Sequence, residues 1–181
     1  MIHEGAPGHH FQLSAQQLIK GVPMLRKVLP FSAYAEGWAL YAERVAKVDM
    51  GFYESDPLGD LGRLQAEMFR AVRLVVDTGM HARHWSREQA IEYMVAKTGM
   101  TEAEVTREIE RYVVWPGQAT SYKVGQLAIL RMRDQAEKEL RPKFDLRGFH
   151  EVVLMNGSMP LAVLEDVVQE WIKAEQAKPS A

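Results

Sequence analysis

The sequence predicts an all-α fold, an irregular bundle of seven to eight helices that forms a single domain over residues 1–181. Apolar residues recur at spacings of three and four along most of the chain, which is typical of amphipathic helices. The alternation of apolar and polar residues that marks a half-buried strand never runs for more than four residues. Turn-forming residues separate the helical stretches, at Gly21–Pro23, Pro30, Asp56–Pro57, Gly99, Pro116–Gly117, Arg141–Pro142 and Asn156–Gly157.

Three helices in the first half of the chain are predicted from the spacing of their apolar residues. These residues are Phe11, Leu18 and Ile19 in the first helix, Tyr34, Trp38, Tyr41 and Val45 in the second, and Leu64, Met68, Ala71, Val72, Val75 and Val76 in the third, which covers residues 61–80. Each set falls on one side of an α-helix, so each helix has an apolar face to bury.

The later helices are predicted from start signals as well as from spacing. Ser86 with Gln89, and Thr101 with Glu104, have the residue types of capping boxes, in which each side chain bonds the backbone N–H of the other residue. The last three helices are expected at residues 119–140, interrupted only by Gly125, at residues 148–155, and after Pro160.

Charge and composition exclude several classes of function. Lys and Arg number 22 and Asp and Glu number 24, so the net charge of −2 and the pI of about 6.3 argue against nucleic-acid binding. No apolar run approaches the about 20 residues that span a bilayer, so no membrane-spanning segment is expected. The first residues lack the basic and apolar segments of a signal peptide, which predicts a cytoplasmic location. Cysteine is absent, so a metal site must use histidines and carboxylates.

The first ten residues contain His3, His9 and His10, three of the six histidines of the chain. Metallohydrolases of the HExxH type place two histidines at positions i and i+4 of one helix face. They also place a glutamate directly after the first histidine, where its carboxylate reaches the metal-bound water. Glu4 follows His3 here, but position i+4 is Pro7. On a straight helix, histidines at i+6 and i+7 could not share an ion with His3.

A shared metal therefore requires a distorted backbone. A bulge at Ala6, Pro7 and Gly8 would absorb two residues and bring His9 into the i+4 role. The alternative interpretation is a frayed, solvated end of the chain that binds nothing. His10 remains an alternative to His9 as the second ligand.

A third metal ligand is expected from a later helix. Residues 31–43 offer Glu36 and Glu43, which are seven apart and so share a helix face. Glu36 lies among Tyr34, Trp38 and small residues, where a carboxylate is costly to bury unless it is paired or bound to a metal. Glu43 is interpreted either as orienting a ligand imidazole or as a surface residue. The alternative for both glutamates is a solvent-facing position on an amphipathic helix.

Five blocks of the sequence together resemble the DUF885 family: HEGAPGHHFQ, YAEGWALYAE, DTGMHARHWSREQAIEYM, PGQATSYKVGQL and NGSMPL. The resemblance implies a relation to the gluzincin metallopeptidases and a fold that is the C-terminal portion of a larger metallopeptidase-like fold. It implies that His3, His9 and Glu36 bind Zn²⁺ and that Glu4 is the general base. Typical family members carry a long segment before the HE motif and are often exported.

Other residues are candidates for binding the substrate. Tyr122 and His81 could donate a hydrogen bond to the oxyanion that forms during hydrolysis. The alternatives are a core tyrosine with a satisfied hydroxyl and an ordinary histidine near a helix C-terminus. Arg70 and Arg73 lie on an apolar helix, where they would pair with internal carboxylates or hold the C-terminal carboxylate of a peptide.

The sequence thus predicts a zinc-dependent metallopeptidase-like hydrolase that acts on peptides through a Glu-activated, metal-bound water. The alternative is a catalytically inactive helical fragment that forms homo-oligomers. In that case association would use the apolar surface left by the N-terminal part of the family fold, which this chain lacks.

Overall fold

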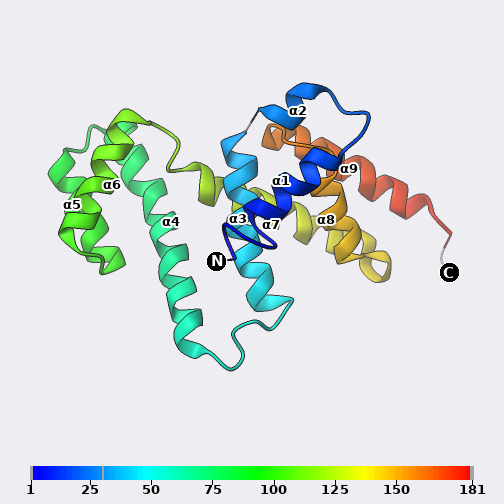
Figure 1. Ribbon diagram of the computed structural model, residues 1–181, viewed down its shortest axis with the longest axis horizontal. Helices are drawn as coiled ribbons and strands as arrows, with labels where there is room; N and C mark the ends of the chain where they lie inside the picture. The colour runs from blue at the N-terminus through cyan, green and yellow to red at the C-terminus, as the bar shows by residue number, and fades with distance from the viewer. Residues whose placement is uncertain (1, 30, 180–181) are drawn as a thin grey trace. The chain divides into compact units, whose positions relative to one another are not determined.

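The computed structural model describes residues 2–29 and 31–179 (Figure 1). These residues form nine α-helices and one short 3-10 helix, and no strand occurs among them. The elements are α1 (His9–Leu18), α2 (Met24–Val28), α3 (Ser32–Val48), α4 (Pro57–Arg83), α5 (Arg87–Thr98), α6 (Glu102–Val114), α7 (Ser121–Leu140), η1 (Arg141–Lys143), α8 (Leu146–Leu154) and α9 (Leu161–Ala177). The all-α prediction is confirmed. The break predicted at Pro30 lies outside the described residues.

Both predicted capping boxes are present. The Ser86 hydroxyl accepts a hydrogen bond from the backbone N–H of Gln89, whose side chain accepts one from the N–H of Ser86. Thr101 and Glu104 exchange the same two bonds at the start of α6. Each box satisfies two backbone donors that the helix itself leaves unpaired.

Two helices differ from the prediction. The five-residue α2 was not expected, because a helix of little more than one turn has no periodicity to recognise. α4 begins at Pro57 and not at residue 61. Its start is fixed by Asp56, whose side chain accepts from the N–H of Gly59, and by the proline in the first turn.

The chain divides into two compact units. The first consists of Met1–Ala42 and Gly125–Ala181, and the second of Glu43–Val124. Helices α3 and α7 each contribute residues to both units. None of the helices in the described part of the chain is long and apolar enough to cross a membrane.

The second unit is built around the packing of α4 against α5 and α6. Its core contains Val76, Met94, Ile109 and Tyr112, each of which is fully buried. Tyr112 is the polar exception, and burial raises the pKa of its hydroxyl, since the nearby charge of Arg73 compensates only in part. The unit thus encloses a hydrogen-bonding group beside its apolar core.

In the first unit, α3 and α7 approach each other closely at two glycines. A Cβ atom on Gly125 would lie 1.9 Å from the carbonyl oxygen of Ala33, and one on Gly37 would lie 2.5 Å from the Cα of Gly125. Neither position has room for a side chain. Gly125 therefore does not interrupt α7, and the contact fixes the turn of α3 that carries Glu36.

Candidate metal centre

The backbone between His3 and α1 contains a two-residue insertion relative to a regular helix. His3 and His9 need such an insertion if they are to bind the same metal ion. In an α-helix each N–H donates to the carbonyl four residues earlier. Here the N–H of His9 donates to the carbonyl of His3 at 2.8 Å, and that of His10 donates to the carbonyl of Glu4 at 3.0 Å. Each of these bonds spans six residues. Residues 2–8 form turns and bends, so His3 comes from a turn that precedes the helix.

Two close contacts hold this turn in place. A Cβ atom on Gly8 would lie 1.9 Å from the carbonyl oxygen of His3, so only glycine fits at this position. The indole N–H of Trp38, on α3, donates to the carbonyl of Pro7 at 2.9 Å. The peptide bond that precedes Pro7 is cis. The turn that carries His3 is therefore tied directly to the helix that carries Glu36.

His3, His9 and Glu36 converge in the first unit. The Nε2 atoms of His9 and His3 lie 3.1 Å and 3.6 Å from the same carboxylate oxygen, Oε2 of Glu36. The two imidazole rings are perpendicular, with centroids 4.9 Å apart. One ligand atom from each residue lies within 4.8 Å of the other two. The side chains of His3, His9 and Glu36 are 11%, 20% and 19% exposed, so the group is shielded but reachable from solvent.

These spacings fit a shared zinc ion. Tetrahedral zinc holds imidazole nitrogen and carboxylate oxygen at about 2.0–2.2 Å, which places neighbouring ligand atoms about 3.4 Å apart. The two His–Glu distances, 3.1 Å and 3.6 Å, fall on either side of that value. The shorter one also suits a charge-assisted hydrogen bond between His9 and Glu36 with no metal. The three side chains are thus compatible with a bound zinc ion and with a metal-free hydrogen bond, and measuring the metal content of the protein distinguishes these two states.

Three other candidates from the sequence, Glu4, His10 and Glu43, lie outside this group. Glu4 and His10 are exposed, and neither contributes to the convergent ligand atoms. The geometry therefore favours His9 over His10 as the second ligand. Glu43 is buried, with only 8% of its surface exposed, which excludes its interpretation as a surface residue.

The two candidates for stabilising an oxyanion, His81 and Tyr122, belong to the second unit. Nε2 of His81 lies 3.0 Å from the carbonyl oxygen of Tyr112. The hydroxyl of Tyr122 accepts a hydrogen bond from the side-chain amide of Gln118 at 3.4 Å. Both side chains thus have partners within their own unit, and their role in catalysis stays a prediction.

Sequence reasoning missed the residues that position the candidate ligands. Trp38 was interpreted only as a core residue, although its indole N–H holds the turn at Pro7. Gly37 and Gly125 fix the turn of α3 beside Glu36. A glycine inside an otherwise helical pattern was the available signal, because it usually marks a close approach when it does not end a helix.

Gly8→Ala is expected to weaken zinc binding at least about tenfold, as misplacing a ligand imidazole does. The added Cβ would collide with the His3 carbonyl that the His9 N–H must reach. Titration against a chelating dye measures the affinity. Gly62→Ala is the matched control, because a Cβ there meets open space. A Gly8→Ala protein that binds zinc as tightly as the control would contradict the proposed use of the turn.

The geometry defines an all-helical chain with a candidate metal centre of two histidines and a glutamate. Its sequence matches the DUF885 family, described as "Bacterial protein of unknown function", over residues 1–168. The chain therefore belongs to the DUF885 family, as the sequence blocks indicated. A search of curated proteins found no match.

The solved structures that are similar to the chain include the following two. A predicted lipoprotein from Colwellia psychrerythraea is 56% identical, with a TM-score of 0.92 over 95% of this chain. A predicted lipoprotein of unknown function from Shewanella oneidensis is 27% identical, with a TM-score of 0.85 over 93% of this chain. The chain spans only 29% and 30% of the lengths of these two relatives.

The expectation of a cytoplasmic location is wrong in the light of these relatives. Both are described as lipoproteins, which points to an exported or membrane-anchored protein. The expectation rested on the residues that precede His3, in a chain that spans less than a third of the length of either relative. The absence of a signal there carries no information about location.

Proposed function

We propose that this chain carries the zinc site of a metallopeptidase-like hydrolase. The observation that supports it most is the convergence of two imidazole nitrogens and one carboxylate oxygen within 4.8 Å of one another. The two-residue insertion before α1 is what brings His9 beside His3. Gly8 has no room for a Cβ atom, and the indole N–H of Trp38 donates to the carbonyl of Pro7. Such specific contacts are not expected in a frayed, solvated chain end.

In this proposal His3, His9 and Glu36 bind the zinc ion, and other residues activate the water and position the ligands. Zinc, when bound, lowers the pKa of a coordinated water to about 7 and polarises a carbonyl group. Glu4, adjacent to His3 and exposed, accepts the proton of the attacking water. The role of Tyr122 or His81 as a donor to the developing oxyanion stays a prediction from the sequence. Trp38 keeps the turn in register with α3.

The substrate class follows from the resemblance to gluzincin metallopeptidases and is a peptide. Because the chain spans less than a third of its solved relatives, the rest of a full-length protein would supply further walls of the binding cleft. We also propose that the protein acts outside the cytoplasm, as the descriptions of those relatives suggest.

Metal removal tests this proposal. Protein purified without a histidine tag should contain about one equivalent of zinc and hydrolyse a mixture of unstructured peptides. Dialysis against a chelator should abolish hydrolysis, and zinc, but not magnesium, should restore it, because magnesium prefers oxygen ligands. Hydrolysis that continues after complete removal of zinc contradicts the proposal.

An exposed apolar face on α4 favours a second candidate, an inactive chain that self-associates. Leu58, Leu61, Leu64 and Met68 follow one side of the helix and are between 48% and 78% exposed. An exposed stripe of this kind is typical of a surface that another chain covers. Sedimentation at several concentrations distinguishes the two, since a monomer at all concentrations excludes this candidate.

A further inference from the structure

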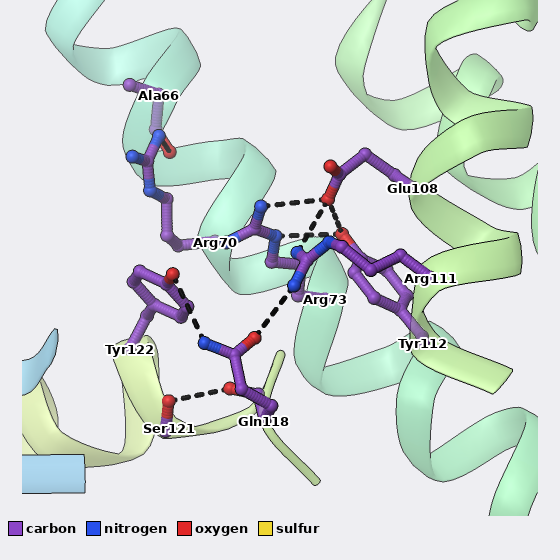
Figure 2. Close-up of polar contacts among 9 residues, drawn as sticks. All are labelled: Ala66, Arg70, Arg73, Glu108, Arg111, Tyr112, Gln118, Ser121 and Tyr122. Atoms are coloured by element: carbon purple, nitrogen blue, oxygen red, sulfur yellow. Dashed lines mark hydrogen bonds and ion pairs between the residues drawn. The ribbon is translucent and has the colours of Figure 1, made fainter. Parts of the chain in front are cut away.

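The second unit contains a cluster of charged side chains between α4, α6 and the start of α7 (Figure 2). Its centre is the carboxylate of Glu108, in which Oε2 accepts hydrogen bonds from Arg73 at 2.9 Å, Arg111 at 2.9 Å and the Tyr112 hydroxyl at 2.7 Å. Arg73 is buried and also donates to the Tyr112 hydroxyl at 2.8 Å. The carboxylate that Arg73 needs is therefore internal, as one of the two sequence interpretations predicted.

Oε2 of Glu108 accepts all three of these hydrogen bonds. Burial by itself would raise the pKa of its carboxyl, but hydrogen bonds from Arg111 and Tyr112 and the charge of Arg73 outweigh burial and lower the pKa to about 2. Glu108 thus stays ionised at every physiological pH. One negative charge is nevertheless shared between two guanidinium groups, which leaves the cluster with an excess of positive charge even before Arg70 is considered.

Arg70 lies one helical turn before Arg73 and has no such partner. None of the carboxylates that the structure describes pairs with it, and its one hydrogen bond goes to the carbonyl of Ala66 at 3.3 Å. Its Nε–H is buried without any hydrogen-bond acceptor. Burying a donor without an acceptor destabilises the folded state, and more so in a charged group, so the hydrogen-bonding capacity of this guanidinium is poorly satisfied.

The nearest acidic residues in the sequence are already engaged. Glu67 accepts from Arg63 at 3.1 Å and from Lys123 at 2.6 Å. Asp77 accepts from the backbone N–H of Gly117 at 3.1 Å. Neither pairs with Arg70, so the two acidic residues nearest to it in the sequence leave its guanidinium without a carboxylate partner.

Aromatic rings flank the Arg70 guanidinium. Its central carbon lies 5.5 Å from the ring centroid of Phe69 and 5.9 Å from that of Tyr122. Figure 2 shows Arg70 and Tyr122 on the side of the cluster away from Glu108. Gln118 bonds both the Tyr122 hydroxyl and Arg111, at 3.4 Å and 3.0 Å, and so ties this side to the rest of the cluster. Rings beside the guanidinium displace water and strengthen any ion pair that it forms.

We propose that Arg70, flanked by Phe69 and Tyr122, is a binding site for a carboxylate. A carboxylate matches the planar fork of a guanidinium and engages two of its N–H groups at once, which the single carbonyl of Ala66 does not. It also offsets the excess positive charge of the cluster. Two groups have this chemistry: the α-carboxylate at the end of a peptide, and the side chain of an aspartate or glutamate. The site does not depend on the candidate metal centre.

Nuclear magnetic resonance of arginine side chains tests the site in the whole chain. The probes are N-acetylalanine, which has an α-carboxylate, and the α-amide of N-acetylaspartate, which has a side-chain carboxylate. N-acetylalanine amide, which has none, is the control. At constant chloride, we expect the Nε–H signal of Arg70 to shift saturably with one or both carboxylates and not with the control. The tighter of the two probes assigns the source.

Substitutions locate the binding. The Tyr122 ring signals report on variants that lack Arg70. Arg70→Gln should weaken binding at least about tenfold, and Arg70→Lys, which keeps the charge but loses the fork, should weaken it by about threefold or more. Arg107→Gln removes an exposed arginine of α6 and should leave affinity unchanged. The proposal is overturned by a non-saturable shift, by an equal shift with the amide control, or by an equal loss in Arg107→Gln.

Discussion

Glu4→Gln is expected to lower peptide hydrolysis about a thousandfold, within the range that a positioned general base contributes. The amide has the shape of the carboxylate but cannot accept the proton of the attacking water. Zinc content should not change, because Glu4 is exposed and is not one of the convergent ligand atoms. The two quantities to measure are the initial rate of hydrolysis and the zinc content of the same sample.

Glu170→Gln provides the matched control, since Glu170 is an exposed glutamate of α9. It should leave both rate and zinc content unaltered. A Glu4→Gln protein that keeps most of its activity would remove Glu4 from catalysis. One that loses its zinc as well would instead make Glu4 part of the metal site.

Glu36→Gln is expected to weaken zinc binding at least about a hundredfold, since losing even an outer-shell partner of a ligand costs 10–100-fold. The variant replaces the one anionic ligand of the group by a neutral amide while keeping its size. Competition with a chelating dye gives the affinity, and circular dichroism checks that the helices are intact.

The same substitution separates the metal site from a simple ion pair. If His9 and Glu36 only form a hydrogen bond at 3.1 Å, wild type and variant will bind zinc equally weakly and differ only in stability. If they hold zinc, adding zinc will raise the melting temperature of the wild type and not that of the variant. Equal behaviour of the two proteins would dismiss Glu36 as a ligand.

Local rules were enough to predict most of the helices. The capping boxes at Ser86 and Thr101 involve contacts within one turn, and the structure has both. The insertion before His9 could also be predicted, because the spacing of the histidines and the proline between them allow no regular helix to bring the rings together. The hypothesis of a shared metal thus required a distorted backbone before His9. The hydrogen bonds from the N–H groups of His9 and His10 to the carbonyls of His3 and Glu4 have this distortion.

The remaining features depend on residues far apart in the sequence. Trp38 reaches Pro7 over 31 positions, and Arg73 reaches Glu108 over 35. In the sequence, Gly125 has the appearance of a helix break. In the structure it is needed because the carbonyl oxygen of Ala33 leaves no room for a Cβ atom. Periodicity describes which face of a helix is buried but not what lies opposite, so these partners could not be chosen from the sequence.

Zinc-loaded crystals examined on either side of the zinc absorption edge give the most direct test of the metal centre. We expect one anomalous peak in each chain, about 2.0–2.2 Å from an imidazole nitrogen of His3, one of His9 and a carboxylate oxygen of Glu36. A density map with no peak between these three side chains, or with zinc bound only at other residues, would contradict the proposed site.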